Sequence, residues 1–132
     1  MNYRGVIIEE SLENTKVLKR MKILSTDIEP ITEKHRTPHL KQWTLHNVEV
    51  MEDDANEIAK ELSKSLHGGS AQNNWYSDYK NDRTHYIIFK GKIFKVDRTS
   101  KEQYDEARQY GLSLGIPEHQ VDFHPEVKQW KR

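Results

Sequence analysis

The sequence predicts an α+β domain: a mostly antiparallel sheet of about five or six strands with two helices packed on one face. Short runs rich in β-branched and aromatic residues outnumber the stretches with helical periodicity. Strands and helices do not alternate regularly, which argues against a parallel sheet. One pair of strand patterns is joined by a two-residue turn, as in an antiparallel hairpin. Within this class, a ferredoxin-like arrangement and a wrapped, partly closed sheet are both open.

The first half of the chain contains three predicted strands, at residues 3–9, 22–31 and 42–50. Residues 12–21 are expected to hold a helical turn, and the polar residues 32–40 a loop. Pro30 places the end of the second strand at a sheet edge, because proline cannot donate a hydrogen bond to a strand ladder. In the third strand, His46, Val48 and Val50 share one face by their spacing of two.

Two helices are predicted, one starting at Asp54 and one opened by Ser100. Glu57 and Gln103 stand three residues after these starts, which is the spacing of a capping box. Apolar residues of the first helix follow at steps of three and four and form one stripe: Ala55, Ile58, Ala59, Leu62 and Leu66. Gly115 ends the second helix, because glycine readily adopts the left-handed conformation beyond a helix.

The clearest hairpin lies between residues 84 and 97. A turn at Gly91 would place Ile88 opposite Ile93 across the two strands. One face of this hairpin is the better candidate for the core, and it carries His85, Ile87, Phe89, Phe94 and Val96. Residues 75–80 form a further short strand before it.

Composition bounds the class of protein. The 132 residues predict one domain over residues 1–124 and a polar C-terminal tail over 125–132. The chain has no cysteine, which excludes disulfides and thiolate chemistry, and its apolar runs are too short for a signal or a membrane span. We therefore expect a soluble, cytoplasmic protein. With 21 basic and 21 acidic residues, the chain has no global field that would favour nucleic acid.

Standard phosphate-loop, dinucleotide, nucleophile-elbow, zinc-protease and EF-hand motifs are absent, so no cofactor and no metal is predicted. The least ordinary segment spans residues 75–80 and mixes aromatic with charged side chains. It could form a stacking and hydrogen-bonding wall for a small ligand. The predicted ligand-binding residues are Trp75, Tyr76, Tyr79 and Lys80. The alternative is an edge strand whose aromatic rings simply pack inward.

Three titratable residues are the candidates for catalysis: His46, Asp78 and His85. Both histidines lie on strand faces assigned to the core, and a carboxylate beside a buried imidazole is a common acid–base arrangement. Neutral core histidines bonded to backbone carbonyls are the alternative. His35 and His39 have a spacing that can bind zinc on a helix, but Pro38 between them favours solvated loop histidines.

Three functions remain open from the sequence. The leading one is a non-catalytic module that binds a small molecule or regulates a partner. A homo-oligomer formed by sheet edges or aromatic residues would fit this function. The second is a small enzyme that uses His46, Asp78 and His85 on a polar substrate. The third is a weak nucleic-acid binder, which the scattered cations of the hairpin do not favour.

Overall fold

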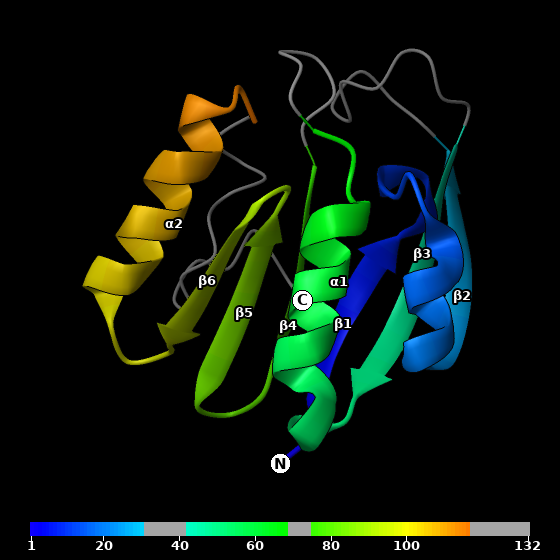
Figure 1. Ribbon diagram of the computed structural model, residues 1–132, viewed down its shortest axis with the longest axis horizontal. Coiled ribbons are helices and arrows are strands. Elements are labelled where there is room, and N and C mark those ends of the chain that lie inside the picture. The colour runs from blue at the N-terminus through cyan, green and yellow to red at the C-terminus, as the bar shows by residue number, and fades with distance from the viewer. Residues whose placement is uncertain (31–41, 69–74, 117–132) are drawn as a thin grey trace.

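The computed structural model describes residues 1–30, 42–68 and 75–116. In this part of the chain, a six-stranded antiparallel sheet with two α-helices confirms the predicted α+β class (Figure 1). The strands are β1 (Tyr3–Ile8), β2 (Lys22–Pro30), β3 (Gln42–Val50), β4 (Tyr76–Lys80), β5 (Thr84–Phe89) and β6 (Lys92–Asp97). The helices are α1 (Ala55–Ser65) and α2 (Lys101–Ser113), with short 3-10 helices η1 (Glu9–Ser11), η2 (Thr15–Arg20) and η4 (Glu52–Asp54).

The strands lie in the order β2-β3-β1-β4-β5-β6, so the N-terminal strand is central. β1 joins the two halves of the sheet by pairing with β3 on one side and β4 on the other. β2 is an edge strand, as Pro30 predicted. The β5–β6 hairpin has the expected register, with Ile88 opposite Ile93, and Gly91 occupies its turn at a φ of 74°.

Helix boundaries follow local chemistry in part. The side chain of Ser100 accepts a hydrogen bond from the Gln103 backbone at 3.2 Å and caps α2, as predicted. Gly115 follows α2 at a φ of 85°, also as predicted. Asp54, in contrast, makes no side-chain capping bond to α1, because η4 precedes the helix and leaves Asp54 in a helical conformation.

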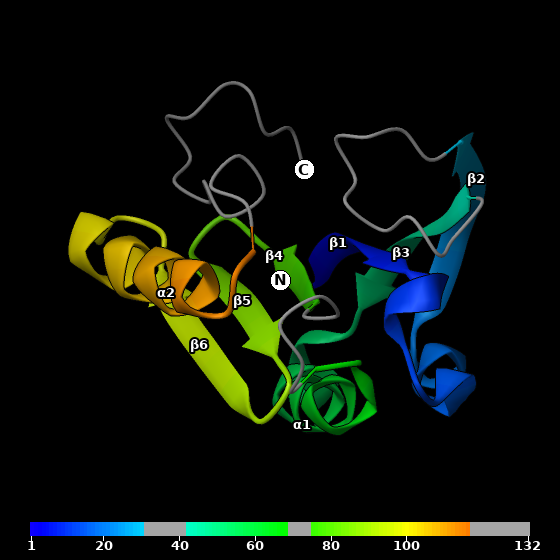
Figure 2. The same cartoon turned by 90° about the horizontal axis from the view of Figure 1, so that it is seen from above.

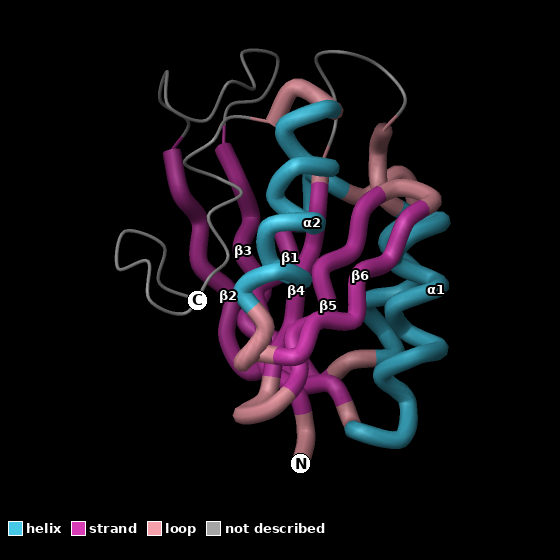
Figure 3. Tube along the Cα trace, turned by 90° about the vertical axis from the view of Figure 1, so that its left-hand side faces the viewer, coloured by secondary structure: helices cyan, strands magenta, loops and turns pink. Residues whose placement is uncertain are grey.

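The two α-helices lie on opposite faces of the sheet, which corrects the prediction that both pack on one face (Figures 2 and 3). The reason is visible in β5, whose apolar side chains alternate between two cores. Tyr86 and Ile88 belong to the core beneath α1, whereas Ile87 and Phe89 belong to the core beneath α2. The face with Ile87 and Phe89, the better core candidate from the sequence, is buried, and the other face of β5 is buried as well.

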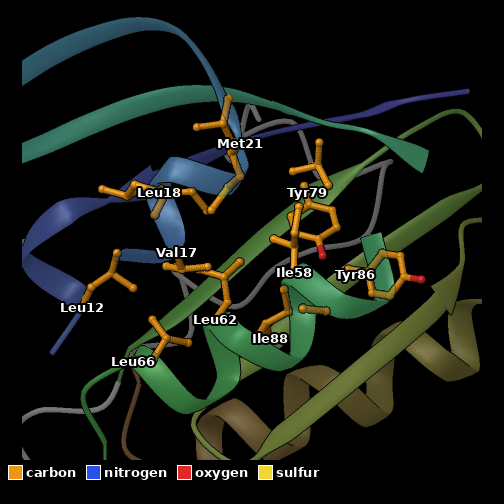
Figure 4. Packing of buried hydrophobic residues seen from close by; sticks show 14 of the residues in the cluster. Leu12, Val17, Leu18, Met21, Ile58, Leu62, Leu66, Tyr79, Tyr86 and Ile88 are labelled. Atoms are coloured by element: carbon orange, nitrogen blue, oxygen red, sulfur yellow. The ribbon is translucent and has the colours of Figure 1, made fainter. Parts of the chain in front are cut away.

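The larger core lies between one face of the sheet and the layer formed by α1 and η2 (Figure 4). The predicted stripe of α1 is buried there, including Ile58 and Leu62, neither of which has exposed surface. η2 adds Val17 and Leu18 to the same core. It is the helical turn that was expected within residues 12–21. The smaller core lies between α2 and the outer strands.

The element order βββαβββα differs from the β-α-β-β-α-β order of ferredoxin-like domains, so that option does not describe this sheet. The sheet ends in two edge strands, β2 and β6, so it is open rather than closed on itself. The predicted tail at 125–132 lies outside the described residues. No helix in the described part of the chain is long and apolar enough to cross a membrane.

Candidate functional site

A buried polar network joins β4, β5 and α2. The Nε2 atom of His85 lies 2.7 Å from the Oδ2 atom of Asp78, and its Nδ1 atom lies 3.1 Å from the Tyr104 hydroxyl. Each of these three residues is only 2% exposed. Strand alternation explains the meeting of the first two: Asp78 stands opposite Ile87, two residues from His85, so both side chains point to the α2 face.

Arg98 connects this network to the surface. Its guanidinium interacts with the Tyr104 hydroxyl, and its Nη1 atom donates a 2.7 Å hydrogen bond to the carbonyl of Asn81. Burial raises the pKa of Tyr104 above its ordinary value, and this effect outweighs the lowering by Arg98. The Tyr104 hydroxyl therefore stays protonated at neutral pH, in contact with both His85 and Arg98.

Beside Arg98 lies an open cavity of about 670 Å³, within the range of small-molecule sites. Its walls come from the N-terminus, β1, β2, β3 and the β4–β5 turn. The lining residues are Met1, Asn2, Arg4, Gly5, Val6, Leu24, Ser25, Asn47, Val48, Lys80, Asn81, Asp82 and Arg98. Three of these side chains are cationic and one is a carboxylate, so the described lining is positively charged.

The cations converge because of strand register. Arg4 on β1 stands opposite Lys80 on β4, and Lys80 stands opposite His85 on β5. Arg98 reaches the same region from the end of β6 through its bond to Asn81. Glu49, opposite Arg4 on β3, is the nearest countercharge in the register but does not line the cavity.

The amide side chains of the lining serve mainly as structure. Asn81 accepts hydrogen bonds from the Arg83 and Thr84 backbone at 2.9 and 2.8 Å and so forms the β4–β5 turn. Asn47 donates to Ser25 at 2.9 Å. The Nε atom of Arg98 is buried, and no residue in the described ranges accepts its hydrogen bond. The groups best placed to bind a ligand are therefore the cations.

The structure brings two of the three candidate catalytic residues together and separates the third. Asp78 and His85 form the buried pair on the α2 face. His46 stands opposite Ile7, which points into the core beneath α1, so His46 lies on the other face of the sheet. Its imidazole contacts Thr26 at 2.9 Å and Glu9 at 3.1 Å instead. An acid–base centre that needs all three side chains does not form.

The predicted aromatic wall is divided between both faces of the sheet. Tyr76 packs in the core beneath α2, whereas Trp75 and Tyr79 pack in the core beneath α1. The Tyr79 hydroxyl donates a 2.5 Å hydrogen bond to the Ala55 carbonyl, so it serves the docking of α1. Of the four predicted ligand-binding residues, only Lys80 lines the cavity.

The remaining candidate residues form no further site in the part of the chain that the structure describes. His35 and His39 lie outside the described residues. Where the structure is described, no group of three or more histidine, aspartate or glutamate residues could hold a metal ion. The hairpin cations do not form one stripe, because Lys92 stands opposite Phe89 and Lys95 stands opposite Tyr86, on the two different faces.

Reasoning from the sequence missed Arg4 as a site residue and treated Arg98 only as one of several hairpin cations. No local pattern marks either residue, because Arg4 joins the site through the pairing of β1 with β4, and Arg98 joins it through its hydrogen bond to Asn81. Comparison of the chain with protein-family models, curated proteins and solved structures finds no match.

Proposed function

We propose that this protein is a non-catalytic binding module for a small organic anion that carries a carboxylate or phosphate group. The observation that carries the proposal is the convergence of Arg4, Lys80 and Arg98, from three separate strands or their ends, around one open cavity. Guanidinium groups match the geometry of carboxylate and phosphate oxygens and bind them with charge-assisted hydrogen bonds.

The contacts of Arg98 support the same conclusion. Its Nη1 atom is bonded to the Asn81 carbonyl, and its guanidinium interacts with the Tyr104 hydroxyl of the Asp78–His85–Tyr104 network. These contacts hold the Arg98 side chain beside the cavity, so less freedom would be lost when it binds an anion.

The enzyme hypothesis has weaker support. A general base has to reach the proton it removes, directly or through one water. Asp78, His85 and Tyr104 are each only 2% exposed, and none of them lines the cavity beside Arg98. The arrangement is that of a closed structural network rather than of a reacting group. Nucleic-acid binding by the hairpin stays a prediction, because Lys92 and Lys95 lie on opposite faces and do not form one positively charged surface.

Calorimetric titration with inorganic phosphate, pyrophosphate and succinate tests the proposal. We expect saturable binding of at least one of these probes, with an affinity that falls as salt is added, because screening weakens exposed charges. Arg4→Gln and Arg98→Gln should each lower the affinity about tenfold or more, as expected for a charge-assisted hydrogen bond.

Lys19→Gln is the matched control, because Lys19 is an exposed cation on η2 that does not line the cavity. It removes the same charge and should leave the affinity unchanged. Arg4 is exposed, so Arg4→Gln separates loss of binding from loss of folding. Absence of saturable binding for all three probes, or equal weakening by Lys19→Gln, would show that the cavity is not an anion site.

A further inference from the structure

The outer edge of β2 is unusually apolar for an exposed surface. Three of the five large hydrophobic residues that are exposed in the described part of the chain lie on this strand: Ile23 at 43%, Leu24 at 42% and Ile28 at 63% exposure. β2 is nine residues long and, within residues 1–30, 42–68 and 75–116, pairs with β3 on one side only. Long edge strands with apolar side chains pair readily with a further strand, and proteins normally protect them.

The register with β3 shows how the side chains of β2 are distributed. Ile23 stands opposite Val48 and Ser25 opposite Asn47, so Leu24 is an extra residue in a β-bulge. Counting across this bulge, Ile23, Thr26 and Ile28 share the face covered by α1. The opposite face carries the residues between them: Lys22, Ser25, Asp27 and Glu29.

The side chains of β2 are complementary to those of a second, antiparallel copy of the same strand. If two copies of β2 run antiparallel about a twofold axis at Thr26, with Leu24 bulged in each copy, residues of like face stand opposite each other. Ile23 then pairs with Ile28 of the other copy, and Lys22 pairs with Glu29. Each pair occurs twice by symmetry, which gives two apolar and two oppositely charged cross-strand contacts.

We propose that the β2 edge is a homodimer interface, in which two copies of this chain join their sheets into one continuous antiparallel sheet. The partner is a second copy because the charge and apolar patterns of β2 match under a twofold operation, the usual symmetry of homodimers. Leu24 and Ser25 of β2 also line the anion cavity, but the apolar and oppositely charged residues that pair across the interface do not.

Sedimentation velocity on the intact chain and on two charge-reversal variants tests the interface. We expect a dimer for the native chain. Lys22→Glu and Glu29→Lys should each weaken self-association about tenfold or more, because each places like charges opposite one another at both ends of the interface. Both residues are exposed, and circular dichroism of each variant checks that its fold is retained.

A mixture of the two variants provides the sharpest test. In the mixed dimer, the introduced glutamate at position 22 faces the introduced lysine at position 29, and the native Glu29 faces the native Lys22. Dimer formation should return close to the native level in the mixture alone. The proposal would be overturned if the native chain is a monomer, or if neither substitution weakens the dimer. It would also be overturned if mixing the two variants does not restore dimer formation.

Discussion

The side chain of Asp78 is ionisable, buried and in direct contact with His85, so its loss should lower the stability of the protein strongly. Removing one partner of a buried polar pair leaves the other without its hydrogen bond in a medium that cannot solvate it. We expect Asp78→Ala to lower the free energy of unfolding by about 3 kcal/mol, measured by chemical denaturation.

Asp105→Ala is the comparison for this prediction. Asp105 is exposed on α2 and contacts Lys101 at 3.4 Å, so its loss should change stability by no more than about 0.5 kcal/mol. A double-mutant cycle between Asp78 and His85 then isolates their pairwise energy. Equal effects of Asp78→Ala and Asp105→Ala would mean that the buried network does not stabilise the fold.

At the scale of elements, β1 and β4 approach each other unusually closely at Gly5. A Cβ atom at this position would lie 2.1 Å from the carbonyl oxygen of Asp78 and 2.8 Å from the Cα atom of Tyr79. Both are backbone atoms, so only a shift of a whole strand could make room. The pairing that joins the two halves of the sheet therefore requires glycine at position 5.

We expect Gly5→Ala to lower the free energy of unfolding by about 3 kcal/mol or more, because it overpacks backbone against backbone. Gly91→Ala is the matched change: its Cβ would meet nothing within 4 Å, and only the φ of 74° opposes it. It should cost about 1 kcal/mol. Chemical denaturation of both variants measures the difference, and a smaller loss for Gly5→Ala than for Gly91→Ala would contradict the close approach.

The helices illustrate how much an element's own sequence determines. The cap at Ser100 and the stop at Gly115 depend on neighbouring residues, and both predictions are confirmed. The apolar stripe of α1 predicted which side is buried. The stripe did not predict which face of the sheet receives the helix, because that choice depends on side chains of β4 and β5 that are distant in the sequence.

For the whole molecule, stability should fall at alkaline pH because tyrosines are buried in both cores. Burial raises the pKa of Tyr79, Tyr86 and Tyr104 above their ordinary value. Above a pH of about 10 the unfolded chain releases these protons while the folded protein retains them. The unfolded state is then favoured, so the free energy of unfolding should decrease as the pH rises beyond that point.

Chemical denaturation between neutral and strongly alkaline pH measures this decrease. Tyr79, which has the largest shift, should contribute a slope of up to about 1.4 kcal/mol per pH unit. Tyr79→Phe should therefore flatten the alkaline part of the profile, although it loses the bond to Ala55 at every pH. Ile88→Val, in the same core, should lower the whole profile without changing its slope. Parallel profiles for native protein and Tyr79→Phe would refute this account.

The candidate site was only partly predictable. Alternation selected His85, and Asp78 was selected as a carboxylate in the aromatic segment before it; the structure brings the two into contact. The same rule could not show that His46 points to the other face, because face assignment between strands needs their register. The predicted ligand wall combined Tyr76 with Tyr79, although residues three apart in a strand point to opposite faces of the sheet.

By itself, the sequence determined the α+β class, the strand positions, the hairpin register and the ends of α2, because each depends on residues close together in the chain. The tertiary structure decided the central place of β1, the opposite positions of α1 and α2, and the meeting of Arg4 with Lys80 and Arg98. The physical reason is that pairing between distant strands is selected by the combined burial of both sheet faces, and no single segment contains that information.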